Sequence, residues 1–343
     1  MRPVSPLGGA LLLIACRADP IPEIDRYPAG TPFRTMERTV AGTKLRLIDT
    51  GPGGGGVPVI FIHGLGASVY SWRYQLGPTT AAGHRAVAFD NRGFGFSGKP
   101  RRGYDNAAYA RLVLALMDSL QIPDAVLVGQ SMGGAIALEV AARSTQRVRG
   151  LVLIGAAGLG VRRPSALQLA RWPLVGPVLS GLRGRRFTAK VLRTTYGDPA
   201  KVTERDVDQY YAPVADPGYT RAFRAVLREF RFDGLAGRLT VIQTPSLVIW
   251  GGRDRWIPPA LGKQMASELP RAAFVVIPEA GHAVNEEAPD AVNRLIVSFL
   301  REGLPRVPEN LARGPQPVRW SWPKGALGVH FLNYLVEEIR HGA

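Results

Sequence analysis

The residue of this chain best suited to nucleophilic chemistry is Ser131, in the pentapeptide GQSMG. An apolar, strand-like run over residues 125–128 precedes it, and a helix-like run over residues 135–142 follows it. On a sharp strand-to-helix turn a serine takes strained backbone angles that hold its hydroxyl clear of the sheet, and glycine two residues to either side leaves room for the bend. The pentapeptide therefore predicts that Ser131 attacks a carbonyl carbon.

A serine hydroxyl needs a base to remove its proton, and the base needs a partner that fixes its tautomer. Of the five histidines, His282 is the best candidate base, because it follows a strand-like run and precedes a helix-like one. Asp254, in GGRDRWIP, follows the strand-like run 246–250 and is the candidate acid. The chain order is therefore Ser, Asp, His, and we expect all three side chains at one sheet edge.

Alternating strand and helix patterns must position these residues. Such alternation predicts an α/β fold with a mostly parallel central sheet that is covered by helices on both faces. The first two strands, 44–49 and 57–62, are separated by the turn GPGGGG and predict a hairpin-like start. The further expected strands are 85–89, 125–128, 150–154, 246–250 and 273–277, and the expected helices are 70–76, 104–120, 131–143, 260–269 and 290–300.

The alternation of strand-like and helix-like segments stops between residues 156 and 245, where the sequence is rich in arginine, helix-patterned and interrupted by prolines. Because the alternation resumes at residue 246, this segment is interpreted as a helical cap inserted into a core of residues 33–155 and 246–303. The insertion starts at the sheet edge that is expected to hold Ser131, so it should lie over the site and control access. Trp172 is its candidate substrate-binding residue, with packing on the body as the alternative.

With these motifs in their order, residues 31–303 resemble the α/β-hydrolase fold superfamily. The resemblance rests on HGLG at His63, DNRGFGFSGKP at Asp90, GQSMGG at Gly129, GGRDRWIP at Gly251 and EAGH at Glu279. It implies that the backbone N–H groups of Leu65 and Met132 form the oxyanion hole, with simple turn formation as the alternative for Leu65. Because the sequence gives little support for a metal site, the reaction is expected to run without a cofactor.

The resemblance gives other polar residues structural roles. Asp90, Arg92 and Ser97 are expected to shape a loop, and His63 to hold the loop of the oxyanion hole. Some members of the superfamily carry the acid one strand earlier, but residues 155–158 contain no carboxylate here. The simplest interpretation of Glu286 and Glu287 is that they are helix-start charges favoured by the helix dipole.

A serine nucleophile, where the haloalkane dehalogenase and epoxide hydrolase branches of this fold have an aspartate, indicates acyl chemistry. The sequence predicts a serine hydrolase that cleaves carboxylic esters through an acyl-enzyme intermediate, on a small-molecule substrate with an apolar acyl group. Lactonase, carbon–carbon bond hydrolase and perhydrolase-like activities on the same triad are alternatives. A ligand-binding or scaffold lipoprotein that retains the fold is the alternative outside enzymes.

The formal charge of +16 on 343 residues invites a nucleic-acid interpretation. The basic residues are scattered and no nucleic-acid-binding motif accompanies them, so no nucleic-acid partner is expected. A cluster of arginines and Lys190 within residues 183–193 is better placed for anionic headgroups, although a solvated helix face explains it as well. No HExxH motif or close histidine pair occurs, and no metal site is expected.

The single cysteine, Cys16, ends the apolar run LLLIAC after the basic residue Arg2. This pattern resembles the lipobox of a bacterial lipoprotein signal peptide over residues 1–16. It predicts lipidation of Cys16 and a membrane-anchored protein of the cell envelope, with a cytoplasmic protein as the alternative. The proline-rich residues 17–32 would then form a tether.

Residues 304–343 extend past the last core helix through a proline-rich stretch. They end in a candidate amphipathic helix over residues 326–339, which is expected to pack on the body or to meet a membrane surface. No apolar run of the chain reaches the length of a membrane span.

Overall fold

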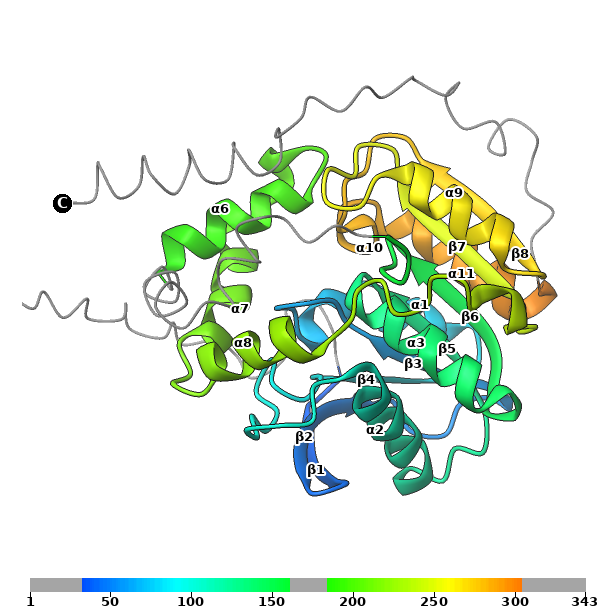
Figure 1. Cartoon of the computed structure of the whole chain (residues 1–343), viewed down its shortest axis with the longest axis horizontal. Helices are drawn as coiled ribbons and strands as arrows, with labels where there is room; N and C mark the ends of the chain where they lie inside the picture. The colour runs from blue at the N-terminus through cyan, green and yellow to red at the C-terminus, as the bar shows by residue number, and fades with distance from the viewer. Residues whose placement is uncertain (1–32, 161–183, 304–343) are drawn as a thin grey trace, which may run out of the picture.

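The computed structural model describes residues 33–160 and 184–303, and its centre is an eight-stranded sheet (Figure 1). The strand order is β1-β2-β4-β3-β5-β6-β7-β8. Strands β3 to β8 run parallel to one another, whereas β1 and β2 are antiparallel to their neighbours. The strands are β1 Met36–Val40, β2 Thr43–Asp49, β3 Gly56–Ile62, β4 His84–Phe89, β5 Ala125–Gln130, β6 Val148–Ile154, β7 Ser246–Gly251 and β8 Ala272–Ile277.

The prediction of a hairpin between β2 and β3 is wrong. β2 pairs with β4, and β3 lies on the other side of β4. The reason is a set of contacts that fixes β4 against the end of β2: Arg85 forms an ion pair with Asp49 at 2.6 Å, and Thr50 N donates to Ala86 O at 3.1 Å. The hairpin of this region is instead β1–β2, whose turn places Ala41 and Gly42 at φ values of 45° and 70°.

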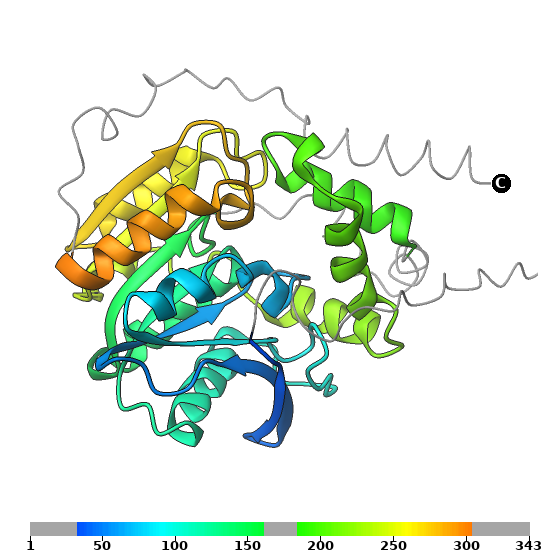
Figure 2. The same cartoon turned by 180° about the vertical axis from the view of Figure 1, so that it is seen from behind.

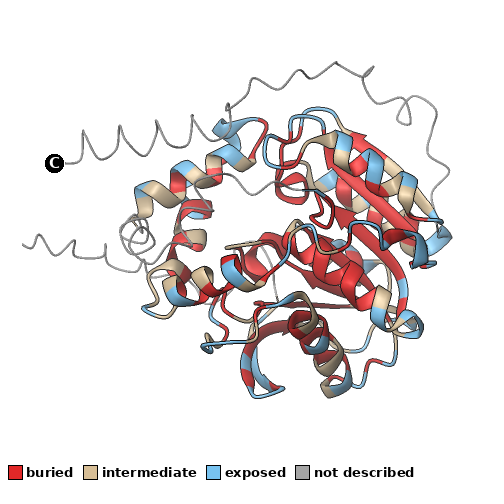
Figure 3. Ribbon diagram, in the orientation of Figure 1, coloured by how far each residue is buried: buried red, intermediate tan, exposed pale blue. Residues whose placement is uncertain are grey.

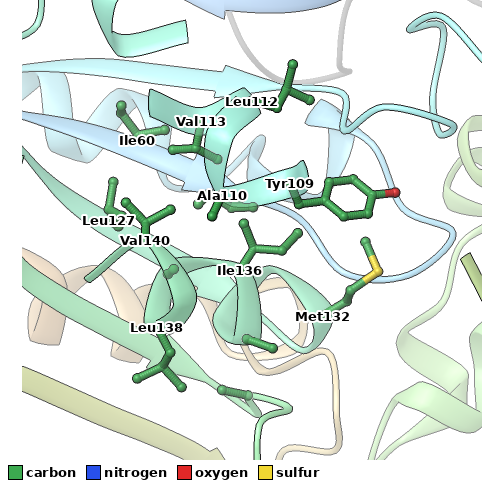
Figure 4. Packing of buried hydrophobic residues seen from close by; sticks show 14 of the residues in the cluster. Ile60, Tyr109, Ala110, Leu112, Val113, Leu127, Met132, Ile136, Leu138 and Val140 are labelled. Atoms are coloured by element: carbon green, nitrogen blue, oxygen red, sulfur yellow. The ribbon is translucent and has the colours of Figure 1, made fainter. Parts of the chain in front are cut away.

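Helices cover both faces of the sheet, as the alternating pattern predicts. α2 Asn106–Ser119, α3 Met132–Arg143 and α9 Pro259–Glu268 pack on one face, and α1 Leu76–Ala81 and α11 Pro289–Glu302 pack on the other. Alternate residues of each central strand serve the two faces: in β3, Ile60 belongs to the first core cluster and Phe61 to the second. Figure 4 shows Ile60 and Leu127 of the sheet beside side chains of α2 and α3.

Local signals explain where these helices begin and end. Asp105 caps α2 by accepting a hydrogen bond from Ala108 N at 2.8 Å. α11 has Pro289 in its first turn and ends at Gly303, whose φ of 81° stops the helix. The shorter elements are η1 Val69–Trp72, η2 Thr145–Arg147, η3 Pro199–Lys201, η4 Leu239–Val241 and α10 Val284–Glu287.

Between β6 and β7 the described chain forms three α-helices, α6 Arg185–Thr195, α7 Glu204–Val214 and α8 Tyr219–Glu229. Figures 1 and 2 show them gathered together beside the sheet body, and we refer to them as the cap helices. Figure 3 shows that they mix buried and exposed residues, whereas the central strands are buried along most of their length.

Several predictions fall on residues outside the described ranges: Cys16, the tether 17–32, Trp172 and the extension 304–343. These remain predictions from the sequence. Among the described residues no helix is both long and apolar enough to cross a membrane.

Candidate active site

The chain turns sharply at Ser131 between β5 and α3. Ser131 has φ 52° and ψ −117°, a conformation that L-residues rarely adopt and that costs of order 1–3 kcal/mol. Two hydrogen bonds hold the turn in place: Ser131 N donates to Ile154 O at 3.0 Å, and Ala157 N donates to Ser131 O at 2.9 Å. A side chain at Gly133 would collide with the carbonyl group of Ile62, so glycine is required there for the helix to pass this close to β3.

The structure brings the three predicted catalytic side chains into one chain of hydrogen bonds. His282 Nε2 lies 2.9 Å from Ser131 Oγ, and His282 Nδ1 lies 2.8 Å from Asp254 Oδ2. His282 is 5% exposed and Asp254 is 6% exposed, so water has little access to the pair. This is the geometry that lets an imidazole accept a proton from serine at one nitrogen while a carboxylate fixes the other nitrogen as a donor.

The loop after β7 fixes the orientation of the Asp254 carboxylate. Asp254 Oδ1 accepts hydrogen bonds from Trp256 N at 2.8 Å and Ile257 N at 2.9 Å, which leaves Oδ2 for the histidine. The loop after β8 lies directly against it, because Arg253 N donates to Ala280 O at 2.9 Å. Adjacent parallel strands thus deliver the acid and the base to the same sheet edge.

The HGLG segment after β3 lies against the serine turn. A Cβ atom added to Gly64 would stand 3.2 Å from Ser131 Cβ. Met132 is the first residue of α3, where a backbone N–H has no acceptor within the helix, and the described residues offer no acceptor for Leu65 N either. Both predicted oxyanion-hole donors are therefore available to a bound oxygen, although their role stays a prediction.

His63 has the structural role that the sequence suggests. Its Nδ1 donates to Gly64 O at 2.7 Å, and its Nε2 accepts a hydrogen bond from Asn91 N at 2.8 Å, so the ring joins two loops. Burial lowers the pKa of His63 although the Asp90 carboxylate acts against it. The neutral ring suits this arrangement, since a protonated ring could not accept from Asn91.

The loop that begins at Asp90 is also structural, as expected. The fully buried Asp90 carboxylate accepts hydrogen bonds from Val69 N at 2.7 Å and Phe96 N at 2.8 Å. Ser97 Oγ donates to Asp90 O at 2.7 Å, and Arg92 binds Thr43 and Gly103. None of these side chains reaches the triad.

Sequence reasoning missed two residues that contact the base. The indole ring of Trp256 stacks on the His282 imidazole with ring centroids 5.7 Å apart and planes 9° apart, and Trp256 Nε1 donates to Thr194 Oγ1 of α6 at 3.1 Å. Gln130 Nε2 donates to His282 O at 3.1 Å and so holds the backbone of the base. Gln130 precedes the predicted nucleophile directly, which is the one sequence signal that pointed to it.

Glu286 lies in the first turn of α10, as the sequence predicted, but its side chain is also buried in an ion-pair cluster that the sequence did not indicate. Arg73 contacts Glu286 Oε2 at 2.5 Å and Asp206 Oδ1 of α7 at 2.8 Å. Tyr70 donates a hydrogen bond to Asp206 at 2.7 Å, and Tyr210 donates one to Glu286 at 2.5 Å. We call these five residues the Arg73 cluster. The cluster joins three elements: η1 with the Arg73 that follows it, cap helix α7, and α10, which follows His282.

Arg73 affects its two carboxylates unequally. Burial raises the pKa of Glu286, although Arg73 and Tyr210 act against it. For Asp206, burial also acts to raise the pKa, but Arg73, Tyr70 and Thr203 together outweigh it and the pKa is lowered. One cation between two carboxylates therefore favours the charged form of Asp206 more than that of Glu286.

Glu287 also lies in the first turn of α10, as predicted, and its side chain likewise has buried partners that the sequence did not indicate. Its carboxylate accepts hydrogen bonds from Gly281 N at 2.7 Å, next to the base, and from Gly197 N and Asp198 N of the cap, both at 2.8 Å. Glu287 thus connects the loop of His282 to the segment that follows α6.

Two arginines of the predicted basic cluster, both on α6, form ion pairs inside the cap. Arg185 forms ion pairs with Asp208 at 2.6 Å and Glu204 at 2.8 Å, and Arg193 forms one with Glu204 at 3.1 Å. These pairs hold α6 against α7. In the described ranges no group of three or more histidine, cysteine, aspartate or glutamate side chains is placed to hold a metal ion.

Comparison with known proteins identifies the family to which this fold belongs. A family model described as alpha/beta hydrolase fold matches residues 57–289. The chain is 35% identical over 270 residues to the dihydrolipoyllysine-residue acetyltransferase component of the acetoin cleaving system of Pseudomonas putida, covering 77% of this chain and 68% of that protein. It is 31% identical over 288 residues to 2-hydroxymuconate semialdehyde hydrolase of Pseudomonas putida, covering 80% and 97%.

Among solved structures, the enol-lactonase of Burkholderia xenovorans LB400 matches with a TM-score of 0.65 and 26% identity, over 78% of this chain and 100% of that one. The chain therefore belongs to the alpha/beta hydrolase fold family, and the predicted fold class is confirmed.

Proposed function

We propose that this hydrolase cleaves carboxylic esters through an acyl-enzyme intermediate on Ser131. The observation that carries the proposal is the unbroken contact from Ser131 Oγ to His282 Nε2 at 2.9 Å and from His282 Nδ1 to Asp254 Oδ2 at 2.8 Å. Such a chain activates a serine, because the imidazole takes the hydroxyl proton as the oxygen attacks.

In the proposed reaction Ser131 Oγ attacks the ester carbonyl carbon while its proton passes to His282 Nε2. The negative oxygen that forms is bound by the N–H groups of Leu65 and Met132, each of which is worth about 10²- to 10³-fold in rate in comparable sites. His282 then gives the proton to the leaving alcohol. Water, activated by the same base, releases the acyl group and restores the serine.

We assign an apolar acyl group to the substrate. An aromatic group from the core and the cap supports this: Phe94, Tyr219 and Phe223 pack with ring centroids 5.8 to 6.5 Å apart. Tyr219 also lies close to Gly66 of the HGLG segment, so the aromatic group borders the site. Trp172, outside the described residues, is proposed to add to this apolar wall.

Carbon–carbon bond hydrolysis is the second candidate. It is supported by the 31% identity to 2-hydroxymuconate semialdehyde hydrolase over 80% of this chain. Ring opening of a lactone is an ester cleavage by the same steps, and the similarity to the enol-lactonase makes lactones part of the main proposal.

A substrate panel separates the candidates. The purified protein would be tested with p-nitrophenyl esters of two to twelve acyl carbons, with lactones and with 2-hydroxymuconate semialdehyde, and Ser131 would be titrated with a fluorophosphonate. We expect stoichiometric labelling and rapid ester turnover with a preference for longer acyl groups. Faster turnover of the semialdehyde than of every ester would favour the second candidate, and labelling without turnover of any substrate would favour a ligand-binding protein.

We also propose that Cys16 carries a lipid that anchors the protein in the cell envelope. The support is the apolar segment that ends at this single cysteine. In a bacterial host, incorporation of labelled palmitate and recovery in the membrane fraction are expected for the unchanged chain and not for Cys16→Ser. A soluble, unlabelled protein would contradict the proposal.

A further inference from the structure

Cap helix α8 begins with Tyr219, whose ring is held firmly between the cap and the core. The residue is 8% exposed. Its ring stacks on Phe223 with centroids 5.8 Å apart and planes 19° apart, and it meets Phe94 edge to face at 6.1 Å. The direction of its hydroxyl is therefore fixed by packing on both sides.

The Tyr219 hydroxyl has no hydrogen-bond partner among the described residues. In contrast, Tyr70, Tyr104, Tyr109 and Tyr210 each donate to a carboxylate or a carbonyl oxygen. The Tyr219 oxygen is nevertheless not one of the fully buried side-chain atoms that lack a partner in the described ranges, so the hydroxyl tip remains accessible although the ring is packed. The Tyr219 hydroxyl is therefore free to donate to water or to a bound molecule.

The position of the hydroxyl indicates what such a bound molecule is. A Cβ atom added to Gly66 would stand 3.2 Å from Tyr219 Oη, and one added to Gly64 would stand 3.2 Å from Ser131 Cβ. The HGLG segment thus contacts the nucleophile turn near one end and the Tyr219 hydroxyl near the other. Burial raises the pKa of Tyr219, so the hydroxyl stays protonated and acts as a donor at neutral pH.

We propose that Tyr219 is a substrate-positioning residue that donates a hydrogen bond to an oxygen atom on the acyl chain of the substrate, a few bonds from the scissile carbonyl. The inference rests on the proposed acyl chemistry and narrows its substrate class to oxygen-substituted acyl groups. The surrounding aromatic rings would bind the chain itself, and the single hydroxyl would select where along the chain the oxygen lies.

The test compares Tyr219→Phe with the unchanged protein on matched esters. The phenylalanine ring keeps the stacking on Phe223 and loses only the hydroxyl. The substrates are p-nitrophenyl esters of equal chain length, one with an all-carbon acyl chain and others with one methylene replaced by an ether oxygen at successive positions. Intrinsic reactivity cancels, because each ester is compared between two proteins.

For one position of the oxygen, Tyr219→Phe should lower kcat/KM about 10- to 100-fold, mainly through KM. For the all-carbon ester the change should stay within about threefold. Equal losses on all esters would assign Tyr219 to the fold or to the oxyanion hole, and no loss on any would leave its hydroxyl without a role; either result overturns the proposal.

Tyr210→Phe is the matched control, because it removes a cap hydroxyl that is bonded to Glu286. It should not discriminate between the esters. The same contrast is read from the rates at which two phosphonates, one with an all-carbon and one with an ether chain, inactivate the protein. Inactivation requires reactive Ser131 but no ester turnover, so failure of the Tyr219 inference and failure of the ester proposal are distinguishable.

Discussion

Two buried clusters of ionisable side chains use the same short segment, residues 282–287. One is the triad, with His282 as its central residue, and the other is the Arg73 cluster, to which Glu286 belongs. Both combine carboxylates, a nitrogen group and hydroxyls at hydrogen-bond distance. Burial and close contact between polar groups therefore do not by themselves identify the reactive site.

The two clusters differ in whether a proton can move. The imidazole of His282 can take the serine proton at Nε2 and pass it on, and the hydroxyl of Ser131 stands on a strained turn with its oxygen 2.9 Å from that nitrogen. The guanidinium of Arg73 stays protonated, and burial raises the pKa of the Tyr70 and Tyr210 hydroxyls. The triad is thus suited to catalysis, and the Arg73 cluster is suited to joining the cap to the core.

The largest expected effect is that of Ser131→Ala. Removing the nucleophile should lower ester turnover by ~10⁴-fold or more and abolish fluorophosphonate labelling. The free energy of unfolding should stay the same or rise slightly, because the substitution removes no buried contact of the core. Both quantities are measured on the same preparation, by ester hydrolysis and by urea denaturation. Labelling that persists in the variant would place the nucleophile elsewhere.

The same substitution at one aspartate of each cluster sharpens the comparison. Asp254→Asn should lower turnover by ~10³- to 10⁴-fold with little change in stability. The N–H groups of Trp256 and Ile257 retain the amide oxygen, so the amide NH₂ faces His282 Nδ1 and forces the proton onto Nε2. The ring can then no longer accept the proton of Ser131.

Asp206→Asn should have the opposite profile. It removes a buried partner of Arg73 and is expected to lower the free energy of unfolding by about 3 kcal/mol, while kcat falls by less than about tenfold. Equal losses of activity and stability in both variants would mean that the two clusters act as one unit. Urea denaturation and kcat, measured side by side for the pair, decide this.

The smallest expected effect is at Glu286, and it depends on pH. A carboxyl whose pKa is raised by folding stabilises the protein at acid pH, and this contribution is lost as the pH rises from the ordinary value of 4.5 through the raised pKa. Glu286→Gln should therefore lower the free energy of unfolding by about 1 kcal/mol near pH 5, and by less near pH 8. Asp206, with a lowered pKa, has the opposite sign, and its contribution is lost as the pH falls below its ordinary value of 3.8. A cost of Glu286→Gln that grows with pH would contradict the assignment.

The sequence predicted what depends on short segments. A strand-like run, a glycine-bounded serine and a helix-like run sufficed to place Ser131 at a strand end, and the same reasoning placed Asp254 and His282 after β7 and β8. The hairpin prediction failed because strand neighbours are decided by pairing across the sheet. Arg85 of β4 is 36 residues away in the sequence from Asp49 of β2, with which it forms an ion pair.

The Arg73 cluster could not be predicted, because its contacts span distant parts of the chain. Arg73 is 133 residues from Asp206 and 213 residues from Glu286. Each of these residues taken alone is an ordinary surface charge in the sequence. Trp256 was missed for a different reason. Its ring stacks on His282 because the Asp254 carboxylate fixes the conformation of the loop, and no residue pattern indicates that conformation.

The place of the cap in the chain also has a kinetic consequence. β6 and β7 pair directly, Leu151 with Ser246, although the whole cap segment separates them. Closing so long a loop is entropically costly and slow compared with forming the β1–β2 hairpin. Ser131 precedes that loop, whereas Asp254 and His282 follow it. During refolding, the onset of reactivity of Ser131 towards a fluorophosphonate should therefore mark the moment at which β6 and β7 come together.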